Sequence, residues 1–203
     1  MMQTDEIGVF LPKYLSEENY RDLLNELKSF PYNMDKRFYT TSLDKNILFQ
    51  GDAYDSLPFA DMANLNNGYM MNYGLIISNT CDMDLSNKRP YPSSIMYAPI
   101  LSFEKYIMYL RKKNISEESI KRNISDIREQ RFTSIFYLPA IYKVPESIVF
   151  LDRIFNIKND YIDRKTLEKH RLFSLSDYGF YLLLFKLSVH FSRIRERVNR
   201  GHL

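Results

Sequence analysis

The sequence has one cysteine and no tryptophan in 203 residues. Cys81 by itself allows no disulfide bond within the chain and no metal site built from several thiolates. Proteins without disulfides are typical of a reducing compartment. The first residues also lack the basic segment and apolar core of a signal peptide. We therefore expect a cytoplasmic protein.

Long apolar runs and strong charge are also missing. No uninterrupted apolar segment reaches the roughly 18 residues that a membrane span requires, because Lys186 and His190 interrupt the stretch 180–191. We expect no membrane association. The formal net charge of +3 is too small to indicate nucleic-acid binding unless basic residues cluster locally.

Aromatic residues, in contrast, are abundant. The chain has 16 Tyr and 14 Phe, with 45% hydrophobic and 26% charged residues, a composition typical of a globular protein. Tyrosine is common at protein interfaces. The base composition of an AT-rich genome explains the same abundance, and we favour it for most of the tyrosines.

The most informative stretch runs from Gly74 to Asp84. Its apolar, partly β-branched beginning around Ile77 predicts the end of a buried strand. Small polar residues from Asn79 to Asp82 follow at once. A rigid strand that ends in side-chain oxygens is a common place for binding or chemistry, although the same residues also form ordinary turns.

Periodicity and capping residues predict the remaining elements. Helices are expected where apolar residues recur at three- and four-residue steps behind a Ser cap, namely at 16–30, in a hairpin over 103–131, and at 174–198. Strands are expected at 37–41, 46–50, 69–79, 94–100, 133–138 and 147–157.

Many short strands, one helical insertion and a final helix predict an α+β protein. We expect a single domain over residues 1–203, with a small, strongly bent antiparallel sheet or barrel. Its core would comprise about residues 37–102 and 132–172.

Several motifs occur in an order that resembles the MazF/PemK-like toxin superfamily. The matching segments are Gln50-Gly51-Asp52, Gly74–Asn79, Tyr97–Ser102 and Glu146–Asp152, followed by Arg171-Leu172 and the last helix. The resemblance implies an SH3-like barrel and a bacterial toxin–antitoxin or antiviral defence role. It also implies metal-independent endoribonuclease activity, RNA binding, an antitoxin or defence-complex partner, and a homodimer.

The chain departs from this family at the residue that matters most. The family's catalytic arginine lies in an Arg-Pro pair shortly before the Val-Ile-Ser strand, whereas Asn72 and Tyr73 stand there in this sequence. The pair Arg89-Pro90 follows the strand instead. The N-terminal helix and the hairpin at 103–131 are additions. A second hypothesis is therefore a non-catalytic interaction module in a multi-protein defence complex.

RNA cleavage through the 2′-hydroxyl needs a base, an acid and positive charge at the phosphate. We identify Asp52 or Asp82 as the candidate base, Arg89 as the phosphate ligand and Ser102 as a hydrogen-bond donor to phosphate. The structural alternative is that the two carboxylates stabilise turns and that Arg89 is solvated. Asp82 and Asp84 have no evident third ligand, so we expect neither a metal nor a cofactor.

The lone cysteine and the basic clusters are two further candidate features. A nucleophilic role for Cys81 requires a basic partner, and His170, His190 and His202 have none that the sequence reveals, so a buried Cys81 is expected. Basic residues in the hairpin alternate with acidic ones and indicate a solvated face. The C-terminal cluster is the better candidate for binding nucleic acid or a partner, with Arg193, Arg195, Arg197 and Arg200.

Overall fold

The computed structural model describes residues 18, 21, 22, 25, 28–30, 37–60, 68–142 and 144–192. Within these ranges the protein is α+β, as predicted, and eight strands form one antiparallel sheet. The strands are β1 (Tyr39–Thr40), β2 (Asp52–Ala60), β3 (Tyr69–Ile76), β4 (Ser94–Ser102), β5 (Ile135–Leu138), β6 (Ser147–Phe150), β7 (Phe155–Lys158) and β8 (Arg171–Leu175). The helices are α3 (Thr80–Met83), α4 (Phe103–Lys112), α5 (Glu117–Arg128), α6 (Leu167–His170) and α7 (Asp177–Phe191).

The sheet curls strongly but is not closed. Its strands lie side by side in the order β1-β8-β2-β3-β4-β6-β5, and β7 also pairs with β4. At the two outer edges, the Tyr39 hydroxyl donates a hydrogen bond of 2.6 Å to the Pro139 carbonyl, and the rings of Phe38 and Phe136 lie 5.7 Å apart. Side chains therefore join the edges. No backbone ladder connects β1 and β5 in the described part of the chain, where β1 is only two residues long.

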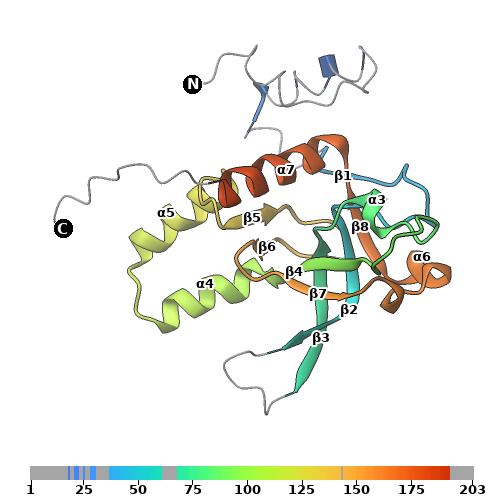
Figure 1. The fold of residues 1–203 in the computed structure, drawn as a ribbon. Coiled ribbons are helices and arrows are strands. Elements are labelled where there is room, and N and C mark those ends of the chain that lie inside the picture. The colour runs from blue at the N-terminus through green and yellow to red at the C-terminus, as the bar shows by residue number, and fades with distance from the viewer. Residues whose placement is uncertain are drawn as a thin grey trace.

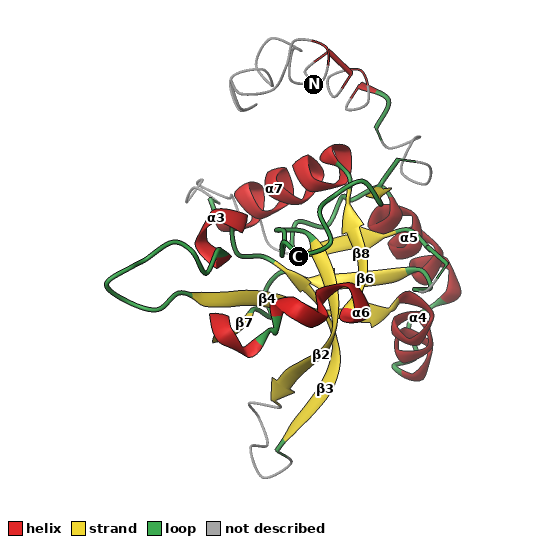
Figure 2. Ribbon diagram, turned by 90° about the vertical axis from the view of Figure 1, so that its right-hand side faces the viewer, coloured by secondary structure: helices red, strands yellow, loops and turns green. Residues whose placement is uncertain are grey.

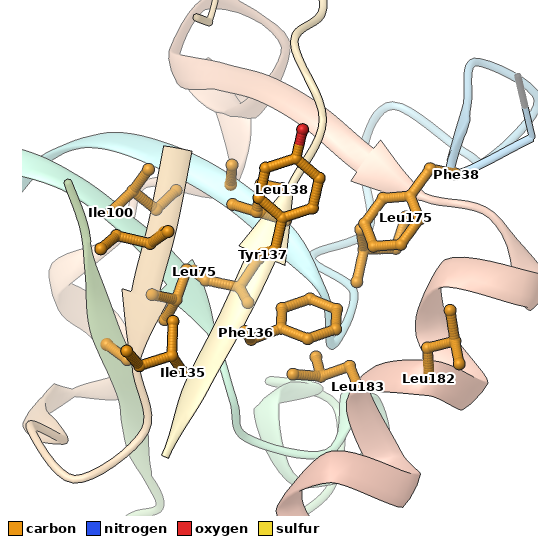
Figure 3. Close-up of a cluster of buried hydrophobic side chains, with 14 of the residues drawn as sticks. Phe38, Leu75, Ile100, Ile135, Phe136, Tyr137, Leu138, Leu175, Leu182 and Leu183 are labelled. Atoms are coloured by element: carbon orange, nitrogen blue, oxygen red, sulfur yellow. The ribbon is translucent and has the colours of Figure 1, made fainter. Parts of the chain in front are cut away.

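Helix α7 covers the main core of this curled sheet (Figure 3). The Ser176 hydroxyl caps the helix by accepting a hydrogen bond from the Gly179 amide at 3.2 Å. Leu182 and Leu183 then pack toward Phe136, Leu175 and their neighbours. Because Ser174 and Leu175 belong to β8, the helix begins later than the sequence predicts.

Helices α4 and α5 occupy the region for which a helical hairpin was predicted (Figure 1). Ser102 and Ser116 cap their N-termini. Phe103 and Ile127 are buried in the same core cluster as the sheet residues, so the hairpin contributes to the core and does not simply lie outside it. The Arg128 guanidinium binds Glu146 through two bonds of 2.8 and 2.9 Å, which ties α5 to the residue before β6.

Strands β2 and β3 extend beyond the sheet as a two-stranded arm (Figures 1 and 2). At the base of the arm, a second cluster of buried residues includes Leu57, Ile76, Tyr97 and Leu167. Along its outer part, the residues Tyr69–Tyr73 are all exposed. We call residues 57–60 of β2 together with residues 69–73 of β3 the β2–β3 arm.

Three strand predictions need correction. Residues 46–50 form a turn and contain no strand, because they are held by side-chain contacts to neighbouring elements. The central strand ends at Ile76, and Asn79 instead caps α3. The strand expected over 147–157 is split into β6 and β7 by a turn at residues 151–154, and both pieces pair with β4.

The N-terminal helix expected at 16–30 lies largely outside the described residues, although positions 18, 21, 22, 25 and 28 are helical. No helix among the residues that the structure describes has the length and apolar character needed to cross a membrane.

Candidate functional site

The end of the central strand is rigidly held. The Ile77 amide donates to the Met96 carbonyl at 2.8 Å, and the buried Ser78 hydroxyl accepts a 2.7 Å bond from the Met96 amide. The side chain of Gln50 donates to the Ile77 carbonyl at 2.8 Å, while its backbone amide donates to Thr80. The polar residues that follow are thus attached to a fixed scaffold.

Asp82 and Arg89 meet in the loop after this strand. Asp82 lies in α3, and its carboxylate accepts a 2.6 Å bond from the Arg89 guanidinium. Their side chains are 51% and 44% exposed, so both can reach a ligand. The Asn87 side chain closes the loop by donating to the Cys81 carbonyl at 2.8 Å. Cys81 itself is exposed, which corrects the expectation that it is buried.

Asp52 is enclosed by other residues of the protein and has a structural role. Its side chain is fully buried and accepts hydrogen bonds from the Ser174 hydroxyl at 2.6 Å and from the Phe49 amide at 2.9 Å. Arg171 Nε forms an ion pair with Asp52 Oδ2, the oxygen that Phe49 also bonds, at 3.1 Å and without the alignment of a hydrogen bond. Burial raises the pKa of the Asp52 carboxyl to about 6, against the opposing effect of Arg171. A carboxylate so enclosed cannot contact a substrate in this conformation.

Ser102 lies apart from the Asp82–Arg89 pair. Its hydroxyl accepts a hydrogen bond from the Lys105 amide at 3.3 Å and caps α4. The strand-end cluster contacts β4 at Met96, and Ser102 is roughly 20 Å further along the same strand. The structure therefore brings together Asp82 and Arg89 but not Asp52 or Ser102.

A pair that the sequence does not reveal lies nearby. The Nδ1 atom of His170 is 2.7 Å from Asp55 Oδ1, although the two residues are 115 positions apart. Both side chains are a little over a quarter exposed. Within the described ranges, Nε2 of His170 has no hydrogen bond, so it is a candidate proton acceptor.

The backbone of β2 is irregular where it presents Asp55. Its register shifts between Tyr54 and Leu57 against β3, and between Ala53 and Tyr54 against β8. Ser56 has a φ of 57°, which is unusual for a residue with a side chain. Bulges and such backbone angles concentrate at functional sites, where they redirect a side chain. Here the irregularity accompanies the contact of Asp55 with α6.

Arg164 links the segments that carry the two pairs. Its guanidinium donates to the carbonyls of Met83 at 2.9 Å and Ile162 at 2.6 Å, so it joins α3 to the segment before α6. Asn159 supports the same junction with a bond of 3.2 Å to the Met83 carbonyl. Burial lowers the pKa of Arg164, and the nearby Tyr54 and Asp84 oppose that effect.

We call this side of the molecule the α3–α6 flank, and its α3 and α6 lie away from the α4–α5 hairpin (Figure 1). The flank comprises α3, the loop to Arg89, residues 159–170 and Asp55. The cations Arg89, Lys165 and Lys169 are exposed on it, together with the anions Asp160, Asp163 and Glu168. An acid–base pair on a flank that also carries exposed cations suits a phosphate-containing ligand.

Two further expectations concern binding. The four C-terminal arginines, Arg193, Arg195, Arg197 and Arg200, lie outside the described residues. Among the described residues, no three His, Cys, Asp or Glu side chains gather in a way that could hold a metal ion.

Comparison with known proteins provides no identification. The chain matches no protein-family model, and the search of curated proteins found no match.

Proposed function

We propose that this protein acts on RNA by metal-independent cleavage of the phosphodiester bond, as a divergent MazF/PemK-like toxin or antiviral effector. The observation that carries the proposal is the Asp55–His170 pair at the bulge of β2. It lies on the same flank as Arg89, the cation that the sequence singled out for phosphate binding.

The chemistry follows from the two pairs. His170 Nε2 removes the proton of the ribose 2′-hydroxyl, and the 2′-oxygen attacks phosphorus. The bond to the 5′-oxygen breaks, a 2′,3′-cyclic phosphate forms, and the leaving oxygen takes a proton from solvent. Asp55 holds the imidazole by Nδ1–H and stabilises its positive charge, while Arg89 offsets the charge on phosphate. Asp82 positions Arg89 before the ligand binds.

Incubation of the purified protein with mixed-sequence RNA in EDTA tests the proposal. His170→Gln is expected to slow cleavage by roughly 100-fold or more, the usual contribution of a general base. His190→Gln in α7 is the matched control and should cleave normally. Thermal unfolding of both variants checks that they fold.

Intact RNA at an excess of wild-type protein would refute the activity. Normal cleavage by His170→Gln would leave the activity standing but exclude this pair as its source. For Arg89→Ala, with Lys88→Ala as control, we expect weaker RNA binding together with slower cleavage.

A second candidate function is a protein-docking module without catalysis. Exposed apolar side chains on α4 favour it, since Met108 is 59% and Tyr109 55% exposed. Removing residues 103–131 would be a poor test because Phe103 and Ile127 belong to the core. Met108→Lys with Tyr109→Lys instead changes only the surface. Co-purification of a genetically adjacent antitoxin or defence subunit should then fall, whereas Glu104→Gln on the same helix should not reduce it.

A further inference from the structure

The outer part of β3 forms a sheet edge that no described element covers. Strand β2 pairs with β3 as far as Tyr69, but β4 pairs with it only at Gly74–Ile76. Along Tyr69–Tyr73, the side facing away from β2 therefore has no strand beside it within the described residues. The side chains here are large and apolar yet exposed, with 69% for Tyr69 and Met70, 46% for Met71 and 40% for Tyr73.

The direction of the free backbone groups follows from the ladder. The Ile77 amide points to β4 and the Ile76 carbonyl points to the β2 side, where it accepts from Gly51. Because backbone groups alternate along a strand, those of Tyr69, Met71 and Tyr73 point off the free edge. The Tyr73 amide donates a 2.8 Å hydrogen bond to the side chain of its own neighbour, Asn72, which takes the position that a carbonyl of a paired strand would have.

Natural sheets usually protect such an edge with charge, proline or a covering element. Residues 68–74 contain neither a charged residue nor a proline. An edge without these protecting residues is expected where the strand pairs with another strand in the functional protein.

The sequence of the edge indicates which strand would pair with it. Residues 68–74 read Gly-Tyr-Met-Met-Asn-Tyr-Gly, and this order is the same in both directions except at Met70 and Asn72. Two antiparallel copies centred on Met71 would place Tyr69 opposite Tyr73 of the second copy. Such a pairing is self-complementary, as a twofold interface requires. A different protein would give no reason for the symmetry.

From this edge we infer that two copies of the chain associate through antiparallel pairing of their β3 strands around Met71. About six backbone hydrogen bonds would join positions 69, 71 and 73 of the two copies. Tyr69, Met71 and Tyr73 share one face of the strand, so two tyrosine pairs flank two methionines across the axis. The absence of charge lets two copies of net charge +3 approach at this edge. The inference does not depend on RNA cleavage, because no residue of the α3–α6 flank takes part.

The first experiment measures mass by analytical ultracentrifugation over a range of protein concentrations. Wild type is expected to form dimers. Met71→Lys should raise the dissociation constant at least tenfold because it places two like charges on the twofold axis. Met96→Lys is the control, since Met96 is similarly exposed at 45% but lies on β4. A wild type that remains monomeric, or a Met71→Lys variant that dimerises normally, would overturn the inference.

A second experiment tests the register. In a Cys81→Ser background, Met71→Cys should form a disulfide-linked dimer under mild oxidation, because directly opposed strand residues have Cα atoms about 5.5 Å apart. Met70→Cys should link poorly, since its opposite residue is Asn72 of the second copy. Equal linking of the two variants would exclude pairing centred on Met71, and a dimer that neither variant links would show that another surface is used.

Discussion

Replacing Gly179 by alanine tests whether packing or helix propensity controls the start of α7. Gly179 lies in the first turn of the helix, where its amide bonds to the Ser176 cap. A Cβ at this position would lie well inside 3.0 Å of the Phe38 carbonyl oxygen. That oxygen belongs to the backbone and also accepts a 3.0 Å bond from the Ser176 amide, so it cannot rotate away.

The two effects have opposite signs. Helix propensity alone favours alanine over glycine by at most about 1 kcal/mol. Overpacking in a well-packed region costs about 1 to 3 kcal/mol, and a contact with fixed backbone belongs near the upper end of that range. We expect Gly179→Ala to lower the free energy of unfolding by about 2 kcal/mol, the difference between 3 and 1. For a chain of this size the melting temperature should fall by roughly 4 to 8 °C.

Urea denaturation and thermal unfolding measure the effect. Ser188→Ala, an exposed position of the same helix, is the matched control and should change stability by only a few tenths of a kcal/mol. An equal or higher stability of Gly179→Ala would show that α7 does not approach Phe38 this closely, and the argument from packing would fail.

Two pH-dependent predictions concern buried charges. Burial raises the pKa of Asp52 from 3.8 to about 6, so the folded protein binds more protons than the unfolded chain between pH 3.8 and about 6. At higher pH the buried, charged carboxylate therefore lowers the free energy of unfolding. Asp52→Asn should therefore gain in stability relative to wild type, by up to about 3 kcal/mol, as pH rises from 4 to 7; a constant difference in urea midpoints would contradict this. Burial lowers the pKa of Lys186 from 10.5 to about 8, while its ammonium group donates to the Gln130 carbonyl. Between pH 8 and 10.5 the unfolded chain binds more protons than the folded protein, so the free energy of unfolding of wild type should rise in that window. Lys186→Met lacks the buried charge and should be more stable than wild type at pH 7. This difference in stability should shrink by pH 10. An advantage independent of pH would show that Lys186 is not buried as a charge.

Part of the candidate site could be found from local sequence. The change from apolar to polar residues after Ile77 marked the strand end, and the loop there does bring Asp82 to Arg89. These residues are only seven positions apart, so a short loop suffices to join them. The pairing of Asp55 with His170 had no local sign because 115 positions separate them.

Asp52 and Ser102 show why residue type alone misled. Both are small polar residues at strand ends, a pattern shared by catalytic and structural roles. The structure gives Asp52 three partners inside the protein and gives Ser102 the amide at the start of α4. Hydrogen bonding to such distant or backbone partners cannot be read from the residues themselves.

The sequence by itself determined the α+β class, since the periodicity of apolar residues and the capping serines depend only on neighbours along the chain. It also determined the uncharged, nearly symmetric edge at residues 68–74. The tertiary structure decided that β4 leaves β3 after Gly74, and hence that no described strand lies beside this edge. It also decided that the sheet stays open and that His170 meets Asp55, because both depend on how strands distant in the chain align.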